Sequence, residues 1–190
     1  MPRARLRATR VYATLACAAL PALLAPAAAD AASAGGATYV APPPPAKRAK
    51  LWRGQAIPPR NAPKRVKLAI KYANRIVRKP YLWGGGHGIM SRMRTDRGYD
   101  CSGTISYALF GGRFLKTSRN SVGFFNFGKR GKGRWITVYT NSGHAYVVIA
   151  GLRLDTSRGS SREPTSGRGP RWRKYRRQAA GFRARHPRGY

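Results

Sequence analysis

The sequence predicts an α+β fold in which two helices precede a small antiparallel sheet. Two observations lead to this class: a helical apolar period over 63–80, and three β-type runs within 134–156. The apolar positions of the first segment are Val66, Ala69, Ile70, Ala73, Ile76 and Val77. Pro63 suits the start of this helix and Pro80 its end.

A second, apolar helix is predicted over 101–110. Asp100 is its expected N-cap, and Gly111-Gly112 end it. Residues 114–133 follow no clean period, so we expect a loop-rich crossing with a short helical turn.

The β-type runs are "RWITVYT" (134–140), "HAYVVIA" (144–150) and "LRLDT" (152–156). Turn residues separate them at 141–143 and 150–151, which predicts an antiparallel meander. If Ala150-Gly151 is a two-residue turn, Ile149 pairs with Leu152.

The chain ends predict three parts. Residues 1–29 have a basic start, a short apolar run and small residues at Ala27 to Ala29, as in a secretory signal. Residues 30–63, with "APPPPA" at 41–46, predict a disordered tether. The folded domain is expected over 64–190, with a basic tail over about 158–190. Trp172, Tyr175 and Phe182 indicate that part of this tail packs back.

The charge is extreme, with 38 Lys and Arg against 5 Asp and Glu. Without the four arginines of 1–29, 34 basic groups remain and the net charge is +29. Such a protein binds polyanions. Because the export signal separates it from nucleic acid, we expect anionic wall or envelope polymers as partners.

Cys101 opens the second helix in "GYDCSGTISYAL" and is the single cysteine left if Cys17 departs with the signal. A helix N-terminus favours the thiolate. Ser102 and Gly103 are small enough to admit a carbonyl, and first-turn N–H groups are candidate oxyanion donors. A lone thiol in an exported protein favours a nucleophile over a buried structural cysteine.

His144 is the candidate base, although a histidine at a strand edge is often structural. In the hairpin register above, Asp155 lies diagonally from His144 on the same face, within reach of the imidazole. Thr156 would face the other way, and a one-residue slip would exchange the two. An arginine is the alternative partner for Asp155.

Tyr81 and Trp83 precede a glycine turn in "YLWGGGHG" (81–88) and either line a cleft or fill the core. The segment lacks the Lys-Ser/Thr of a phosphate loop. Cys101, His87 and His144 lack zinc-site spacing. We therefore expect no metal and no cofactor.

Three strings resemble the NlpC family of papain-like cell-wall cysteine peptidases: Tyr81 to Gly85, Asp100 to Gly103, and Gly143 to Ala145. They stand in the family's order, and the resemblance covers roughly 64 to 157. It implies a papain-like fold with the nucleophile Cys101 on a helix packed against a small antiparallel sheet.

The resemblance also implies His144 as base, a polar residue on the next strand, and Tyr81 beside the oxyanion. Together with Trp83 and Ser102, Tyr81 forms the expected substrate-binding or oxyanion set. The third residue is commonly His, Asn or Gln in the family, whereas this chain offers Asp155 or Thr156. The basic insert around 113–134 is atypical of short members.

The expected function is a secreted or periplasmic, wall-associated and monomeric peptidoglycan endopeptidase. The family's usual bond joins D-γ-glutamyl to diaminopimelate or lysine in a stem peptide. Two alternatives stay open: an amidase or acyltransferase with the same Cys-His pair, and a cationic wall- or membrane-binding protein on an inactive peptidase-like scaffold.

Overall fold

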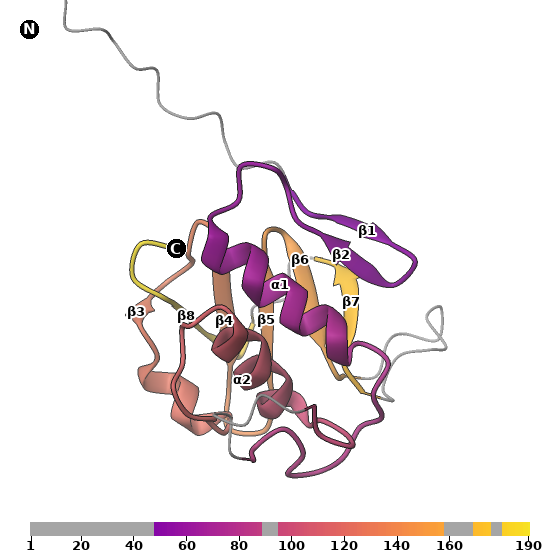
Figure 1. Ribbon diagram of the computed structural model, residues 1–190. Coiled ribbons are helices and arrows are strands. Elements are labelled where there is room, and N and C mark those ends of the chain that lie inside the picture. Colours follow the sequence, from indigo (N-terminus) through magenta and orange to yellow (C-terminus); the bar gives the residue numbers. More distant parts are fainter. Residues whose placement is uncertain (1–47, 89–94, 158–168, 176–179) are drawn as a thin grey trace, which may run out of the picture. The chain divides into compact units, whose positions relative to one another are not determined.

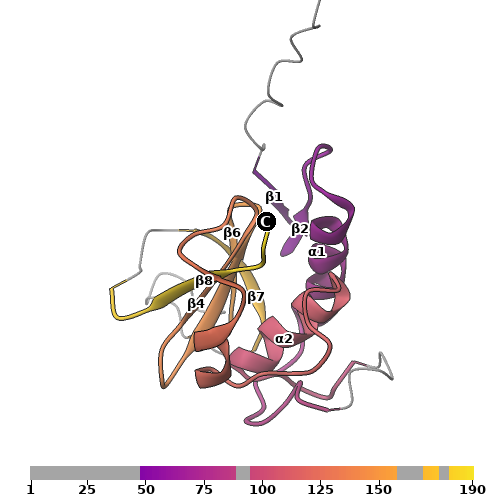
Figure 2. The same ribbon diagram turned by 90° about the vertical axis from the view of Figure 1, so that its left-hand side faces the viewer.

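Two helices cover one face of a six-stranded antiparallel sheet in the computed structural model (Figures 1 and 2). The structure describes residues 48–88, 95–157, 169–175 and 180–190. The predicted α+β class is confirmed, but the sheet is larger than the expected meander. No helix in these described ranges is long and apolar enough to cross a membrane.

The helices are α1 (Lys64–Ile76) and α2 (Cys101–Gly111). All six predicted apolar positions of α1 and its continuation are buried. Helix α2 is buried on nearly all sides because it lies between α1 and the sheet (Figure 2). Past the end of α1, Arg171 donates a 2.6 Å hydrogen bond to the carbonyl of Val77, so a tail arginine satisfies a free helix-end carbonyl.

The sheet has the strand order β3-β8-β4-β5-β6-β7. Its strands are β3 (Lys129–Arg130), β4 (Ile136–Thr140), β5 (Ala145–Ile149), β6 (Leu152–Asp155), β7 (Arg171–Lys174) and β8 (Arg183–His186). The predicted meander forms β4, β5 and β6. The pairing of Ile149 with Leu152 confirms the predicted register of the hairpin.

The C-terminal segment, predicted as a basic tail, supplies two strands of the sheet. Strand β8 lies inside the sheet between β3 and β4, and β7 extends the sheet beyond β6. The expected packing of aromatic residues is confirmed: Trp172 is buried, Tyr175 hydrogen-bonds Tyr139 at 2.9 Å, and Phe182 packs on Tyr146. Residues 158–168 and 176–179 lie outside the described residues.

The expected start of the domain at residue 64 is wrong. A hairpin of β1 (Lys50–Trp52) and β2 (Gln55–Ile57) precedes α1. The side-chain amide of Asn74 on α1 pairs with both backbone groups of Ala56, at 3.0 Å each. The sequence does not predict this hairpin because its strands are short and bury only one small residue, Ala56, so they show no apolar alternation. The predicted signal (1–29) and residues 30–47 of the predicted tether lie outside the described residues.

Candidate active site

Cys101 is the first residue of α2, and Asp100 caps that helix as predicted. The Asp100 carboxylate accepts a 2.7 Å hydrogen bond from the N–H of Gly103. The glycine turn packs directly on this first helical turn. A Cβ at Gly103 would overlap the carbonyl oxygen of Gly85, so this close approach requires a glycine. The glycine turn thus fixes where the helix, and with it the thiol, begins.

Three donors surround the Cys101 sulfur. Its Sγ lies 3.6 Å from the hydroxyl of Ser121, and His144 and the backbone N–H of Ala145 also hydrogen-bond it. Burial raises the pKa of the thiol, but these hydrogen bonds and the charge of His144 outweigh burial, so the pKa is lowered. The site therefore favours a thiolate, the form that acts as a nucleophile.

His144 follows the turn before β5 and contacts Asp155 at the end of β6. Its Nε2 lies 2.9 Å from Oδ1 of Asp155, which leaves Nδ1 as the ring nitrogen for the thiol. Burial lowers the pKa of His144, but the hydrogen bonds and charges of Asp155 and Cys101 prevail and raise it to about 9. A protonated imidazole beside a thiolate is the result.

Asp155 contacts both of its candidate partners, His144 and an arginine. Its side chain is 0% exposed, and besides His144 it pairs with the guanidinium of Arg153 through Oδ2. Burial would raise its pKa, but His144, Arg153 and Ser157 hold it well below the usual range. Thr156 faces elsewhere, and its buried hydroxyl has no partner among the described residues. The geometry therefore favours Asp155 over Thr156 as the residue that orients His144.

A pocket of about 410 Å³ opens over the thiol. Its walls include Trp83 from the glycine turn, Ser102 from α2, and Val122 from the 3₁₀ helix at Val122–Asn126. Trp83 is 84% exposed, so it belongs to the rim of this pocket and not to the core. The hydroxyl of Ser102 donates to Asp100 at 3.1 Å, which leaves its backbone N–H as the group for an oxyanion.

Tyr81 does not line this pocket as the structure describes it. It pairs with Tyr99 through an isolated parallel bridge and is 41% exposed. Burial and the negative charges of Cys101 and Asp100 raise the pKa of its phenol. Tyr81 thus stays a neutral hydroxyl within electrostatic reach of the thiol, and its oxyanion role stays a prediction.

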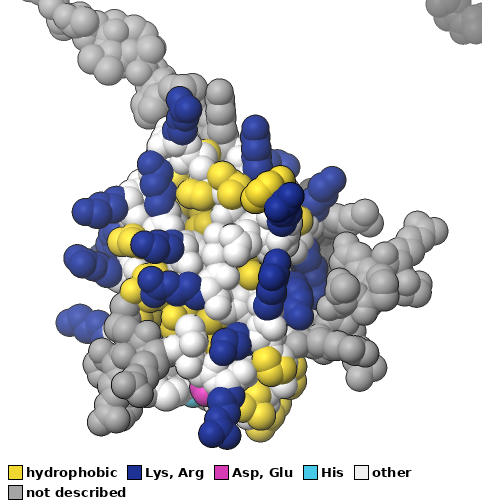
Figure 3. All heavy atoms as spheres, turned by 45° about the vertical axis from the view of Figure 1, so that its right-hand side comes forward, with side chains coloured by type: hydrophobic (Ala, Val, Ile, Leu, Met, Phe, Trp, Pro, Cys, Tyr) yellow, Lys and Arg dark blue, Asp and Glu magenta, His cyan; other side chains and the backbone are white. Residues whose placement is uncertain are grey.

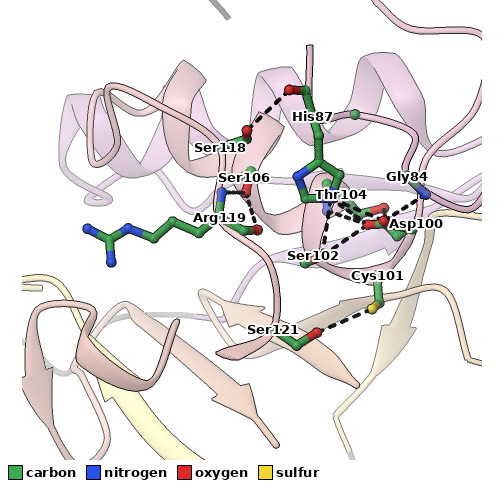
Figure 4. A network of polar contacts seen from close by, with 12 residues as sticks. Gly84, His87, Asp100, Cys101, Ser102, Thr104, Ser106, Ser118, Arg119 and Ser121 are labelled. Atoms are coloured by element: carbon green, nitrogen blue, oxygen red, sulfur yellow. Dashed lines mark hydrogen bonds and ion pairs between the residues drawn. The ribbon is translucent and has the colours of Figure 1, made fainter. Parts of the chain in front are cut away.

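Three residues near the thiol or near His144 were missed as site residues. Ser121 belongs to the aperiodic insert, where no pattern marks a functional position; a hydrogen bond from Thr140 to its carbonyl holds it. Phe182 packs edge-on against the His144 ring at 6.3 Å. The sequence considers His87 only as a zinc ligand without the required spacing, yet it lines the pocket and contacts Asp100 (Figure 4). No local sequence pattern predicts that a histidine 13 positions before Asp100 contacts its carboxylate.

Metal chemistry has no candidate site in the described ranges. No group of three or more His, Cys, Asp or Glu side chains is arranged there to hold an ion. The described donors near the thiol are instead paired with one another, as in Cys101 with His144 and His144 with Asp155.

Comparisons with known proteins give little more. No family model matches this chain, and no curated protein does. Among solved structures, the chain is similar to the P60 domain of the antigen MAP1204 from M. avium subspecies paratuberculosis. The identity is 23% and the TM-score 0.45, over 64% of this chain and 94% of that one. A likeness this distant says nothing about activity.

Proposed function

We propose that the protein is a cysteine peptidase that hydrolyses an amide bond in peptidoglycan stem peptides. One observation carries this proposal: Cys101 at a helix start hydrogen-bonds His144, which Asp155 orients from the next strand. A nucleophile, a base and an orienting group in that order are the minimum for covalent acyl transfer. The motif order shared with the cell-wall peptidases supplies the substrate class.

In the proposed reaction, the Cys101 thiolate attacks the amide carbonyl carbon and forms a carbon–sulfur bond. First-turn N–H groups of α2, among them that of Ser102, would hold the oxyanion, with Tyr81 as a further donor. His144 gives its proton to the leaving amine as the carbon–nitrogen bond breaks. Water, deprotonated by His144, then attacks the thioester carbonyl. The carbon–sulfur bond breaks, the carboxylic acid product leaves, and the Cys101 thiolate is restored beside protonated His144.

The basic surface supports a location on the bacterial wall. Lys and Arg side chains are spread over the face shown in Figure 3, with hydrophobic side chains between them. Anionic wall polymers would attract this surface and concentrate the enzyme on its insoluble substrate. We propose secretion or a periplasmic location on the basis of residues 1–29, and D-γ-glutamyl to diaminopimelate or lysine as the bond.

Digestion of isolated peptidoglycan tests this function. The protein and its Cys101→Ala variant are incubated with the wall, and mass spectrometry identifies the released fragments. Stem-peptide fragments from the unaltered protein alone establish the peptidase and identify the bond. If neither protein releases fragments and both sediment with the wall in a salt-dependent way, the cationic binding protein is the better description.

A further inference from the structure

A second histidine–carboxylate pair lies beside the proposed nucleophile. Nε2 of His87 lies 3.0 Å from Oδ1 and 3.1 Å from Oδ2 of Asp100, and 3.2 Å from the hydroxyl of Ser102. In Figure 4 these three side chains gather at the start of α2, while the Cys101 thiol points away from them toward Ser121. The reaction proposed above does not use His87.

Asp100 creates an electrostatic problem for its neighbour. Its carboxylate accepts from the N–H groups of Gly84 and Gly103 and the hydroxyl of Ser102, which hold it in the ionised form. This negative charge caps the helix, but it stands one residue before the thiol. A nearby carboxylate disfavours a thiolate, so the cap works against the nucleophile that it positions.

His87 has the geometry to remove this conflict. Because the Asp100 carboxylate only accepts, Nε2 of His87 carries a proton and donates it. Among the described residues Nδ1 has no partner, and the ring is 24% exposed, so a second proton has a place to bind. The hydrogen bond to Asp100 outweighs burial and raises the pKa of His87, with a further contribution from the Cys101 charge.

The other charged and titratable groups around the pair do not compensate Asp100. Asp96 is a second carboxylate, bound to the N–H of Gly86, and Tyr81 is neutral. The guanidinium of Arg119 instead donates to the carbonyl of Gly123. His144 is already shared between Asp155 and the thiol.

We propose that protonated His87 neutralises Asp100 and thereby keeps the thiolate of Cys101 favoured, acting as a positioning residue through the helix cap. The inference rests on the proposed function in taking Cys101 as the nucleophile. It makes the thiolate dependent on two imidazoles, His144 by direct contact and His87 through the helix cap.

The rate of Cys101 alkylation by iodoacetamide, measured against pH by peptide-resolved mass spectrometry, tests this without any substrate. His87→Gln keeps an N–H donor for Asp100 but cannot be charged. We expect its alkylation midpoint to rise by about 0.5–1 pH unit, so that the rate below the midpoint falls about three- to tenfold. The control His186→Gln removes a histidine bound to the carbonyl of Gly131 and should leave the midpoint unchanged.

An Asp100→Asn background separates charge from structure. Asparagine still caps a helix, but no carboxylate remains to compensate, so His87→Gln should then shift the midpoint little. An unshifted midpoint in His87→Gln alone, or an equal shift in both backgrounds, overturns the proposal. Inactivity on peptidoglycan with the expected shift would overturn the proposed function alone.

A reciprocal measurement keeps the test open if His87→Gln does not fold. Coupling between two sites acts equally in both directions. Blocking Cys101 with neutral carbamidomethyl should therefore lower the pKa of His87, read from the NMR titration of its ring proton. An unchanged His87 titration after blocking contradicts the proposal.

Discussion

Oδ1 of Asp155 lies 2.9 Å from Nε2 of His144 across the hairpin of β5 and β6. The register that pairs Ile149 with Leu152 places the two residues diagonally on one face, where backbones about 7–8 Å apart allow their side chains to meet. The opposite carboxylate oxygen binds Arg153, whose guanidinium also stacks on Tyr146 at 3.8 Å. A fixed carboxylate thus fixes the imidazole.

Replacing Asp155 with Asn should uncouple His144 from this support. The amide keeps the volume but loses the charge, so the pKa of His144 should fall from about 9 toward its ordinary value. The fraction of thiolate–imidazolium pair falls with it, and we expect kcat/KM to drop by about a hundredfold or more. NMR titration of the His144 ring and hydrolysis of purified stem peptide measure the two effects.

Thr156→Val is the matched control for that change. Its hydroxyl is buried and unpartnered among the described residues, so an isosteric methyl should leave activity unchanged and stability equal or slightly higher. Loss of activity in Thr156→Val with little loss in Asp155→Asn would show that Thr156, and not Asp155, orients His144.

The pH dependence of kcat/KM should be bell-shaped. Activity rises as Cys101 loses its proton, and this happens at a lower pH than for an ordinary thiol because its pKa is lowered. It falls as His144 loses its proton near pH 9. Initial rates on a soluble stem peptide from pH 4 to 10 provide the profile. A flat profile through the neutral range would contradict the ion pair.

Stability should respond to pH through the same histidine. The pKa of His144 is raised to about 9 in the folded protein, above an unfolded value of about 6.5. Its contribution is fully present below the unfolded pKa and is lost as pH rises through the folded one. Urea unfolding of the protein and of His144→Gln should therefore differ most near pH 6 and converge above pH 9. A difference that grows with pH would reverse the sign and refute the assignment.

The predictable parts of this site are those fixed by local pattern. Asp100 and Cys101 are adjacent in sequence. His144 and Asp155 lie on two strands that are joined by a two-residue turn, and the register of these strands follows from one pairing. Ser121 and His87 approach the thiol through long-range packing, in segments without a period. Strand β8 reads "RARH" and carries no apolar alternation, so its place inside the sheet could not be inferred from the sequence.

Gly103→Ala should damage the fold around the thiol. The added methyl would overlap the carbonyl oxygen of Gly85, and backbone cannot swing away as a flexible side chain can. We expect a loss of roughly 1–3 kcal/mol in unfolding free energy, the range for overpacking, and slower alkylation of Cys101. Gly88→Ala is the control, because no atom of the described residues lies within 4 Å of its added Cβ. Equal stability of the two variants would show that the glycine turn does not press on α2.

Truncation after Ala180 should abolish cooperative unfolding, since it removes β8 from its place between β3 and β4 and exposes the edge of β4. A dispensable basic tail would instead leave the melting curve intact.

Phe182→Ala tests the aromatic ring at the site separately from strand β8, which follows it in the chain. The strand pairs through backbone, so the variant should fold with a loss of roughly 1–2 kcal/mol for a half-buried aromatic side chain. His144 then loses its edge-on neighbour at 6.3 Å and gains rotational freedom. A fall in kcat with KM little changed, measured on soluble stem peptide, would show that the C-terminal segment helps to hold the base in place; unchanged kcat would restrict that segment to structural support of the sheet.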